Sequence, residues 1–282
     1  MCQRIALGIE YEGTRYCGWQ RQAQGYSVQG ELEQALSKIA AQPITVQVAG
    51  RTDAGVHGFG QVVHFDTPIE RPTQAWVLGT NRFLPYDIRV KWMKKVTPQF
   101  HARYGAYARR YQYLIYNHSL PPGILRNGIS WFPYPLNSQR MNIAAKSLLG
   151  EHDFRSFQAA QCQSKTAKRR IYQLQVHQDG HLIVIDIIAN AFLYHMVRNI
   201  TGVLLAIGQQ QQPLDWAKTV LLAQDRKQAG ITAPASGLYL IDVKYPSHYG
   251  LPRPTVLPWF FRSEWQVEPY HIPEPSTNTL SI

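Results

Sequence analysis

Residues 44–66 read ITVQVAGRTDAGVHGFGQVVHFD, which is two short runs rich in β-branched residues with a glycine-rich loop between them. Runs of this composition, bounded by glycine, predict strands over 44–49 and 61–66. The loop, Gly50–His57, contains one carboxylate, that of Asp53. Glycines and other small residues let the backbone approach a ligand closely, so this loop is the first candidate for a site of chemistry.

The sequence around this stretch extends it to a six-element unit. Apolar residues alternate over 5–11 as in a strand. Over 28–39 they repeat at helical spacing, directly after Ser27, a residue type that caps helices. The predicted elements of residues 1–104 are a strand at 5–11, a helix at 28–39, strands at 44–49 and 61–66, a helix at 74–84 and a strand at 87–96. Their order is βαββαβ.

The second half of the chain, residues 105–250, repeats that order. Its predicted elements are a strand at 107–117, a helix near 138–149, strands at 169–177 and 181–188, helices near 192–207 and after Pro213, and a strand at 237–245. Asp179 and Gly180 are typical of a tight hairpin turn. We therefore expect an α/β (α+β) fold of two tandem ferredoxin-like, RRM-like units with a basic cleft. A tail rich in proline and aromatic residues follows at 251–282.

Charge and cysteine content narrow the class of protein. The chain has 29 basic and 18 acidic residues, a formal net charge of +11, and residues 1–110 and 111–250 each carry +6. This excess lies in the folded body, which favours a polyanionic partner such as nucleic acid. Three scattered cysteines predict neither disulfides nor a zinc site. With no signal peptide or long apolar run in the sequence, we expect a cytoplasmic protein without a membrane segment.

Common catalytic signatures are absent from the sequence, including those of dinucleotide and phosphate binding, zinc proteases, serine hydrolases and zinc deaminases. No histidine spacing predicts a metal. Arg51 and His57 flank Asp53, and a nearby cation favours the ionised carboxylate that a nucleophile requires. One alternative stays open: residues 57–62 partly match an RRM stacking strand, but Gln61 and His64 stand where aromatic residues belong, so a non-catalytic RRM-like RNA-binding protein is the second hypothesis.

Five further segments of the sequence can be considered together with the Asp53 loop. They are Gly18-Trp19-Gln20-Arg21-Gln22, Phe100-His101-Ala102-Arg103, Arg109-Arg110-Tyr111-Gln112-Tyr113, His195-Met196-Val197-Arg198-Asn199-Ile200 and Gly237-Leu238-Tyr239-Leu240. Together with the Asp53 loop, these segments resemble the TruA-type tRNA pseudouridine synthases from about residue 4 to 250.

This resemblance implies a homodimeric isomerase that needs neither cofactor nor metal and converts uridines 38, 39 and 40 of the tRNA anticodon stem-loop to pseudouridine. By resemblance, Asp53 is the nucleophile, Tyr111 contacts the target base, Arg198 pairs with Asp53, Arg51 helps to expose the base, and Leu238 forms an apolar wall. The reaction itself suits a carboxylate, because covalent capture at ribose C1′ or at uracil C6 divides a difficult rearrangement into easier steps. The sequence leaves both points of attack open.

Two physical features support this assignment. Arg198 lies on an otherwise apolar helix, where a charge ordinarily has a partner. Basic residues also gather where a phosphate backbone could bind. Our candidates for contacts with the RNA backbone are Arg109, Arg110, Lys165, Lys168, Arg169 and Arg170.

Overall fold

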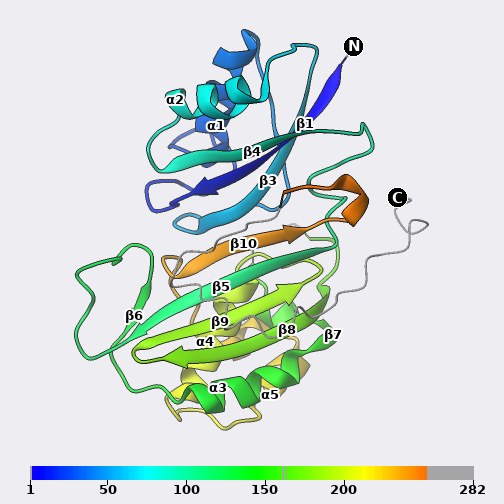
Figure 1. Ribbon diagram of the computed structural model, residues 1–282. Helices are drawn as coiled ribbons and strands as arrows, with labels where there is room; N and C mark the ends of the chain where they lie inside the picture. Colours follow the sequence, from blue (N-terminus) through cyan, green and yellow to red (C-terminus); the bar gives the residue numbers. More distant parts are fainter. Residues whose placement is uncertain (1, 161, 163, 253–282) are drawn as a thin grey trace. The chain divides into compact units, whose positions relative to one another are not determined.

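The computed structural model describes residues 2–160, 162 and 164–252, so the predicted tail lies, apart from residues 251 and 252, outside the described residues (Figure 1). The described chain forms two compact units. Unit 1 contains residues 2–107 and 239–252, and unit 2 contains the described residues of 108–238. The change from unit 1 to unit 2 after residue 107 falls close to the predicted boundary after residue 104. The strand predicted at 237–245 was expected in the second domain, but from residue 239 onward it belongs to unit 1.

Unit 1 is built on a sheet in which β1 lies between β4 and β3. Its elements are β1 (Gln3–Tyr11), α1 (Val28–Ala40), β2 (Gln47–Val48), β3 (His57–Thr67), a π-helical turn (Ala75–Gly79), α2 (Thr80–Phe83), β4 (Ile88–Val96), β10 (Leu238–Lys244) and a 3-10 turn (Ser247–Tyr249). β1 is antiparallel to both neighbours, and Tyr11 at its end pairs with Ile88 and with Gly58. The end of β1 and the starts of β3 and β4 therefore share one end of the sheet.

The core of unit 1 forms where α1 packs on the sheet. Ser27 caps the helix by accepting a hydrogen bond from Gly30 N at 3.2 Å, as the sequence predicts. Leu32 and Leu36 are fully buried, and each contributes about 1.5–3 kcal/mol of apolar burial. α2 packs against α1, and Gly79 just before α2 lies beside the Ile39 side chain of α1.

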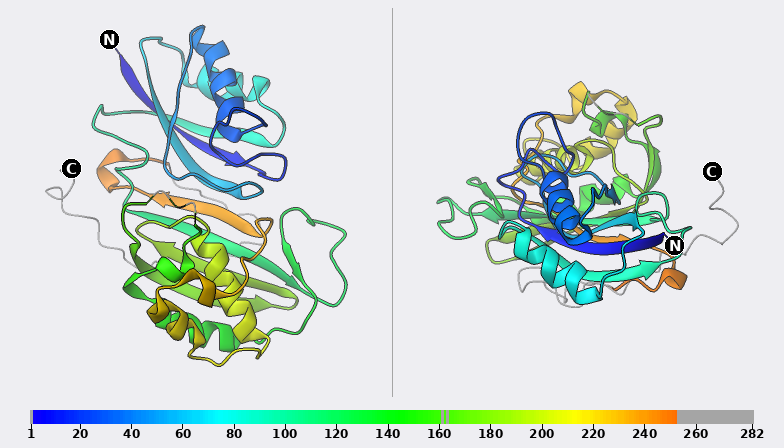
Figure 2. Two further views of the ribbon diagram at one scale, coloured as in Figure 1. Left: turned by 180° about the vertical axis from the view of Figure 1, so that it is seen from behind. Right: turned by 90° about the horizontal axis from the view of Figure 1, so that it is seen from above.

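Unit 2 has a sheet in the order β5-β9-β8-β7, with β6 paired to β5. Its elements are β5 (Ala108–Asn117), β6 (Ser130–Phe132), α3 (Ser138–Ala145), β7 (Gly150–Asp153), β8 (Lys168–Asp179), β9 (Leu182–Ala189), α4 (Met196–Gly208), α5 (Trp216–Ala223) and 3-10 turns at Lys146–Leu148, Arg155–Phe157 and Arg226–Ala229. The three α-helices cover one face of the sheet (Figure 2, left). Asp179 and Gly180 form the predicted hairpin turn, where Asp179 pairs with Leu182.

A mixed α/β fold is confirmed, with some differences in its elements. The predicted helix at 74–84 is a π-helical turn followed by one turn of α-helix, and the strand predicted at 44–49 is reduced to two residues. β6 and β7 were not predicted. That each unit is ferredoxin-like stays a prediction. None of the helices in the described part of the chain combines the length and apolar character needed to cross a bilayer.

Candidate active site

The Asp53 loop connects β2 to β3 through a tight turn. Val56 N donates a hydrogen bond to Asp53 O at 3.1 Å, and Gly55 has φ +77°. A positive φ at the third position is the geometry of a type II turn, which favours glycine there. Asp53, at the first position of the turn, is partly exposed, and Arg51 beside it is exposed. The loop therefore carries both predicted residues on a backbone of defined geometry.

Buried side chains of unit 1 hold this loop from beneath. Gln61 Nε2 donates to Gly50 O at 2.7 Å, and the hydroxyls of Tyr11 and Thr52 lie 2.8 Å apart. Gln61 Nε2 also lies 3.4 Å from the Tyr11 hydroxyl. Burial raises the pKa of Tyr11 to about 12, so its hydroxyl stays protonated at neutral pH. These contacts fix the residues that directly precede Asp53, from Gly50 to Thr52.

The segment after β1 packs against the other side of the loop. Trp19 N donates to Thr52 O at 3.0 Å, and Gly13 N donates to His57 Nδ1 at 3.1 Å. A Cβ on Gly13 would lie 2.0 Å from Val56 O, and one on Gly18 would lie 2.7 Å from Thr52 O. Only glycine allows so close an approach of two backbones.

His57 is a structural residue of this loop. Its Nδ1 accepts the hydrogen bond from Gly13, and its ring stacks on Tyr239 with centroids 4.5 Å apart. Both contacts tie the imidazole to the segments that surround the loop.

The other predicted site residues belong to unit 2. Tyr111 is buried on β5, and its ring packs edge-on against Phe192 at a centroid distance of 4.9 Å. Leu238 is buried; it is the first residue of β10 and the last residue of unit 2 before the chain returns to unit 1. Arg51 and Asp53 thus share a loop of unit 1, whereas Tyr111, Arg198 and Leu238 lie in unit 2.

Arg198 is held in one orientation within unit 2. Its Nε donates to Ala233 O at 2.8 Å, and its own carbonyl accepts from Ala233 N at 3.1 Å. Tyr113 donates to the next carbonyl, Pro234 O, at 2.8 Å. Burial raises the pKa of Tyr113, while the charge of Arg198 acts in the opposite direction, which places the guanidinium near this phenol. The charge that the sequence places on an apolar helix is therefore fixed against the segment leading to β10.

Comparisons with known proteins identify the family of this chain. The family model of the tRNA pseudouridine synthases matches residues 8–105 and 144–246. The chain is 57% identical to the tRNA pseudouridine synthase A of Shewanella piezotolerans over 257 residues, 91% of this chain and 98% of that protein. It is 54% identical to the protein of the same name from Coxiella burnetii, again over 91% and 98% of the two chains.

This chain belongs to the tRNA pseudouridine synthase family. It is therefore an isomerase that converts uridine to pseudouridine in tRNA. Among solved structures, it is similar to a chain of the archaeal box H/ACA sRNP Nop10-Cbf5 complex, with a TM-score of 0.33 and 12% identity, over 71% of this chain and 43% of that one. That likeness is too low to support a conclusion about the reaction.

Family membership favours an enzyme over the RRM-like hypothesis, and the geometry of β3 explains why the stacking pattern failed. Gln61 is fully buried and bonds the Asp53 loop. His64 is also buried, where its Nδ1 accepts from Ala102 N at 3.1 Å. Neither position can offer a face to a nucleotide in this synthase.

The predicted contacts with the RNA backbone divide into outward and inward residues. Lys168, Arg169 and Arg170 are consecutive on β8, where side chains alternate between faces, and Arg169 alone of the three is buried. Its guanidinium donates to Ser164 Oγ at 2.6 Å and to Thr166 O at 3.1 Å, and burial lowers its pKa. The geometry therefore does not favour Arg169 as a phosphate contact of the synthase.

The remaining candidates differ in the same way. Arg110 pairs with the fully buried Asp186, donating from Nε at 2.9 Å to Oδ1, so it too serves the interior. Arg109 donates to Asn190 O at 2.9 Å and is partly exposed. Arg170 is exposed and lies 3.4 Å from Glu151. Lys165 and Lys168 are exposed, and with Arg109 and Arg170 they stay predictions.

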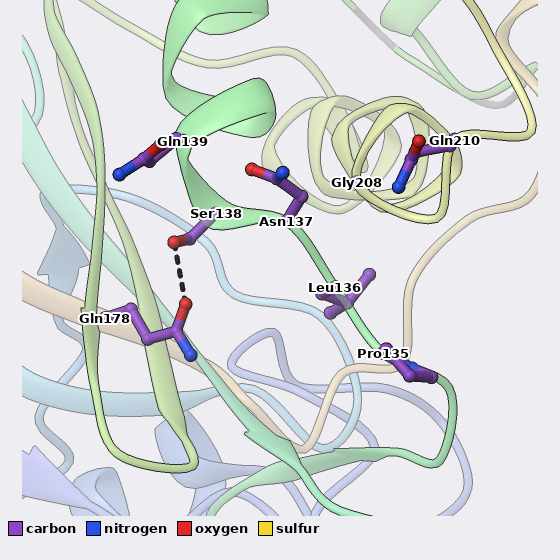
Figure 3. A pocket seen from close by; sticks show the side chains of 8 residues that line it. All are labelled: Pro135, Leu136, Asn137, Ser138, Gln139, Gln178, Gly208 and Gln210. Carbon is purple, nitrogen blue, oxygen red and sulfur yellow. Dashed lines mark hydrogen bonds between the residues drawn. The ribbon is translucent and has the colours of Figure 1, made fainter.

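A pocket of about 350 Å³ lies elsewhere in unit 2, between the start of α3 and the end of α4 (Figure 3). Its lining residues are Pro135, Leu136, Asn137, Ser138, Gln139, Gln178, Gly208 and Gln210. Ser138 donates to Gln178 Oε1 at 2.7 Å across it. None of its lining residues is a predicted site residue or carries a charged side chain. Among the described residues, no group of His, Cys, Asp and Glu side chains is arranged to hold a metal.

Proposed function

We propose that this synthase modifies uridines 38, 39 and 40 of the tRNA anticodon stem-loop, with Asp53 as its nucleophile. The observation that carries the proposal is the construction of the Asp53 loop: a partly exposed carboxylate on a turn that buried Tyr11 and Gln61 hold from one side and Gly13 and Gly18 from the other. Such support is expected for a group that must meet a reacting atom within a few tenths of an ångström. The position within tRNA comes from the resemblance of the motifs.

The target nucleotide must first leave its stem, because neither ribose C1′ nor uracil C6 is accessible inside a stacked helix. Flipping a nucleotide costs a few kcal/mol of pairing and stacking. Arg51 is exposed on the same loop as Asp53, and its guanidinium would fill the vacated stack or neutralise a phosphate of the RNA. Its place two residues before Asp53 in the sequence supports a role for this cation beside the flipped nucleotide.

The reaction then rearranges bonds without a net gain or loss of atoms. The Asp53 carboxylate attacks ribose C1′ and displaces uracil N1, or it attacks uracil C6, and both routes remain open. In either case the bond from C1′ to N1 breaks, the uracil turns, and C5 bonds to C1′. The proton leaves C5, N1 gains one, and Asp53 is released.

Residues of unit 2 complete the proposed site. Tyr111 would contact the uracil, and Leu238 would wall off the base while it is detached. Arg198 would pair with Asp53 and keep it ionised. The bonds of Arg198 to Ala233 support this role, because a guanidinium with a fixed plane can meet a carboxylate without further ordering. From the family resemblance we further propose a cytoplasmic homodimer.

The test is to incubate unmodified tRNA transcripts with purified protein in EDTA and to map pseudouridine by carbodiimide labelling and primer extension. We expect stops at positions 38–40 with the wild type and none with Asp53→Asn. The matched control is Asp179→Asn, because a hairpin turn accepts Asn-Gly as readily as Asp-Gly. Pseudouridine elsewhere in tRNA would refute the position, and full activity of Asp53→Asn would refute the nucleophile.

A further inference from the structure

Tyr86 stands exposed at the tip of the turn that leads into β4. Its side chain is 73% exposed, although a large aromatic ring gains by burial. Ile88 N donates to Pro85 O at 3.2 Å and closes the turn. Arg89 Nη1 donates to Pro85 O at 2.6 Å and to Ile88 O at 2.7 Å. These bonds join Pro85 to Ile88 and Arg89 on either side of Tyr86, so the turn keeps the ring exposed to solvent.

Arg15 covers one side of this ring. Its guanidinium carbon lies 5.4 Å from the ring centroid of Tyr86, within the range of a cation–π contact. Arg15 Nη1 lies 3.3 Å from Asp87 Oδ2, while the side chain of Arg15 is 58% exposed and that of Asp87 is 1% exposed. Asp87 also accepts from the Tyr16 hydroxyl. A buried carboxylate therefore orients a cation that remains open to solvent.

This pair lies at the same end of the sheet as Asp53. Tyr11 pairs with Ile88 on one side and Gly58 on the other, so the strand ends that follow the Tyr86 turn and the Asp53 loop are two strand spacings apart, about 10 Å. The segment carrying Arg15 bridges them, since Glu12 N donates to Asp87 O at 2.9 Å and Gly13 N donates to His57 Nδ1 at 3.1 Å.

We propose that Tyr86 and Arg15 form a second tRNA-binding point, in which Tyr86 stacks on an unpaired base near the target and Arg15 contacts a backbone phosphate. The proposal rests on the proposed function, since an anticodon arm offers unpaired bases beside the modified nucleotides. An exposed ring next to a cation is the combination that binds single-stranded nucleic acid. Because the turn and Asp87 pre-order both groups, little entropy is lost when RNA binds.

The experiment measures binding of a fluorescein-labelled anticodon stem-loop RNA by anisotropy, with the full chain and a range of salt concentrations. Tyr86→Ala should raise the Kd by about fivefold or more, since loss of one aromatic–base stack has that effect at least. Tyr86→Phe, which keeps the ring, should bind within about twofold of wild type. Arg15→Gln should lower the slope of log Kd against log salt by about one unit.

The matched control is Tyr104→Ala. Tyr104 is 69% exposed and also has an arginine over its ring, Arg103 at 5.6 Å. It lies at the opposite end of the sheet, because Arg4 near the start of β1 donates to Phe100 O at 2.8 Å. Removing this ring should leave the Kd unchanged, and the melting curves of Tyr86→Ala, Tyr86→Phe and Tyr104→Ala should match the wild type.

Two results would overturn the proposal. One is an unchanged Kd for Tyr86→Ala. The other is a loss of affinity that accompanies a change in molecular mass by light scattering, which would mean that Tyr86 contacts a second copy of the chain. Pseudouridine formation by the wild type tests the proposed function separately. If no pseudouridine forms while Tyr86→Ala still weakens binding, the chemistry assigned to Asp53 is refuted and the tRNA-binding point is supported.

Discussion

Replacement of Gly18 by alanine tests whether the backbone after β1 positions Asp53. Gly18 has φ +95°, and a Cβ at this residue would lie 2.7 Å from Thr52 O and 3.0 Å from the carbonyl carbon of Asp53. Both atoms belong to the loop backbone and not to a flexible side chain. The added methyl group can be accommodated only if one of the two segments moves.

The structure gives the size of the effect. A left-handed conformation costs a residue other than glycine about 1–2 kcal/mol, and overpacking costs about 1–3 kcal/mol, so the free energy of unfolding should fall by about 2–5 kcal/mol. Reaching an ordinary contact of 3.4 Å requires the loop to move by about 0.7 Å. A misplacement near 1 Å can lower the rate of a reaction by about 100-fold.

The assay is the single-turnover rate of pseudouridine formation at saturating enzyme, which isolates chemistry from binding. Gly180→Ala is the control, because Gly180 has φ +56° and nothing within 4 Å of an added Cβ. It should cost about 1–2 kcal/mol of stability and leave the rate unchanged. If a folded Gly18→Ala variant reacts as fast as Gly180→Ala, the contact with Thr52 does not position the nucleophile.

Three further predictions concern other contacts. Gln61→Leu removes the donor to Gly50 O, so it should lower the free energy of unfolding by about 1–3 kcal/mol and also slow single turnover; a normal rate would contradict the role of Gln61. Burial lowers the pKa of His64 to about 4, so between its ordinary 6.5 and 4 the unfolded chain binds a proton there that the folded chain does not. Stability should therefore fall by up to about 3 kcal/mol as the pH drops through this window, and urea titrations of His64→Gln should show a weaker dependence. Lys168→Gln should lower the salt slope of tRNA binding by about one unit, whereas Arg169→Gln should lower the melting temperature instead; equal slopes for wild type and Lys168→Gln would remove Lys168 from the RNA interface.

Local features of the fold could be predicted from the sequence because neighbouring residues determine them. Ser27 caps α1 through a bond to the residue three places on, and Asp179 with Gly180 closes a hairpin by its own backbone geometry. The Asp53 loop was recognised as a connection between strands for the same reason. A strand period could also have separated Arg169 from its neighbours, since Arg169 shares a face with the buried Ile171.

The support of the candidate site could not be predicted from the sequence, because it depends on pairs that are distant in the chain. Tyr11 lies 41 residues from Thr52, and Gly13 lies 44 residues from His57. In the sequence Gln61 is only a poor match to a stacking position, because its bond to Gly50 exists only once β3 turns its side chain inward. The alternation of residues along β1 or β3 does not predict these contacts.

Arg51 is proposed to contact the RNA, whereas Gln61 bonds the Asp53 loop from within the protein. Replacing these two residues should therefore affect catalysis differently. Arg51 is exposed and its proposed contacts are with the RNA, so removing them should weaken binding of the substrate and of the flipped state. Gln61 is buried and acts on the loop before any RNA arrives, so its loss misplaces the carboxylate in free and bound enzyme alike. Arg51→Gln should therefore change the Kd for tRNA, while Gln61→Leu should change the single-turnover rate at saturating enzyme with little effect on the Kd. An equal change of both quantities in both variants would mean that loop position and RNA binding are one event, and the nucleophile would then be ordered by its substrate and not by the fold.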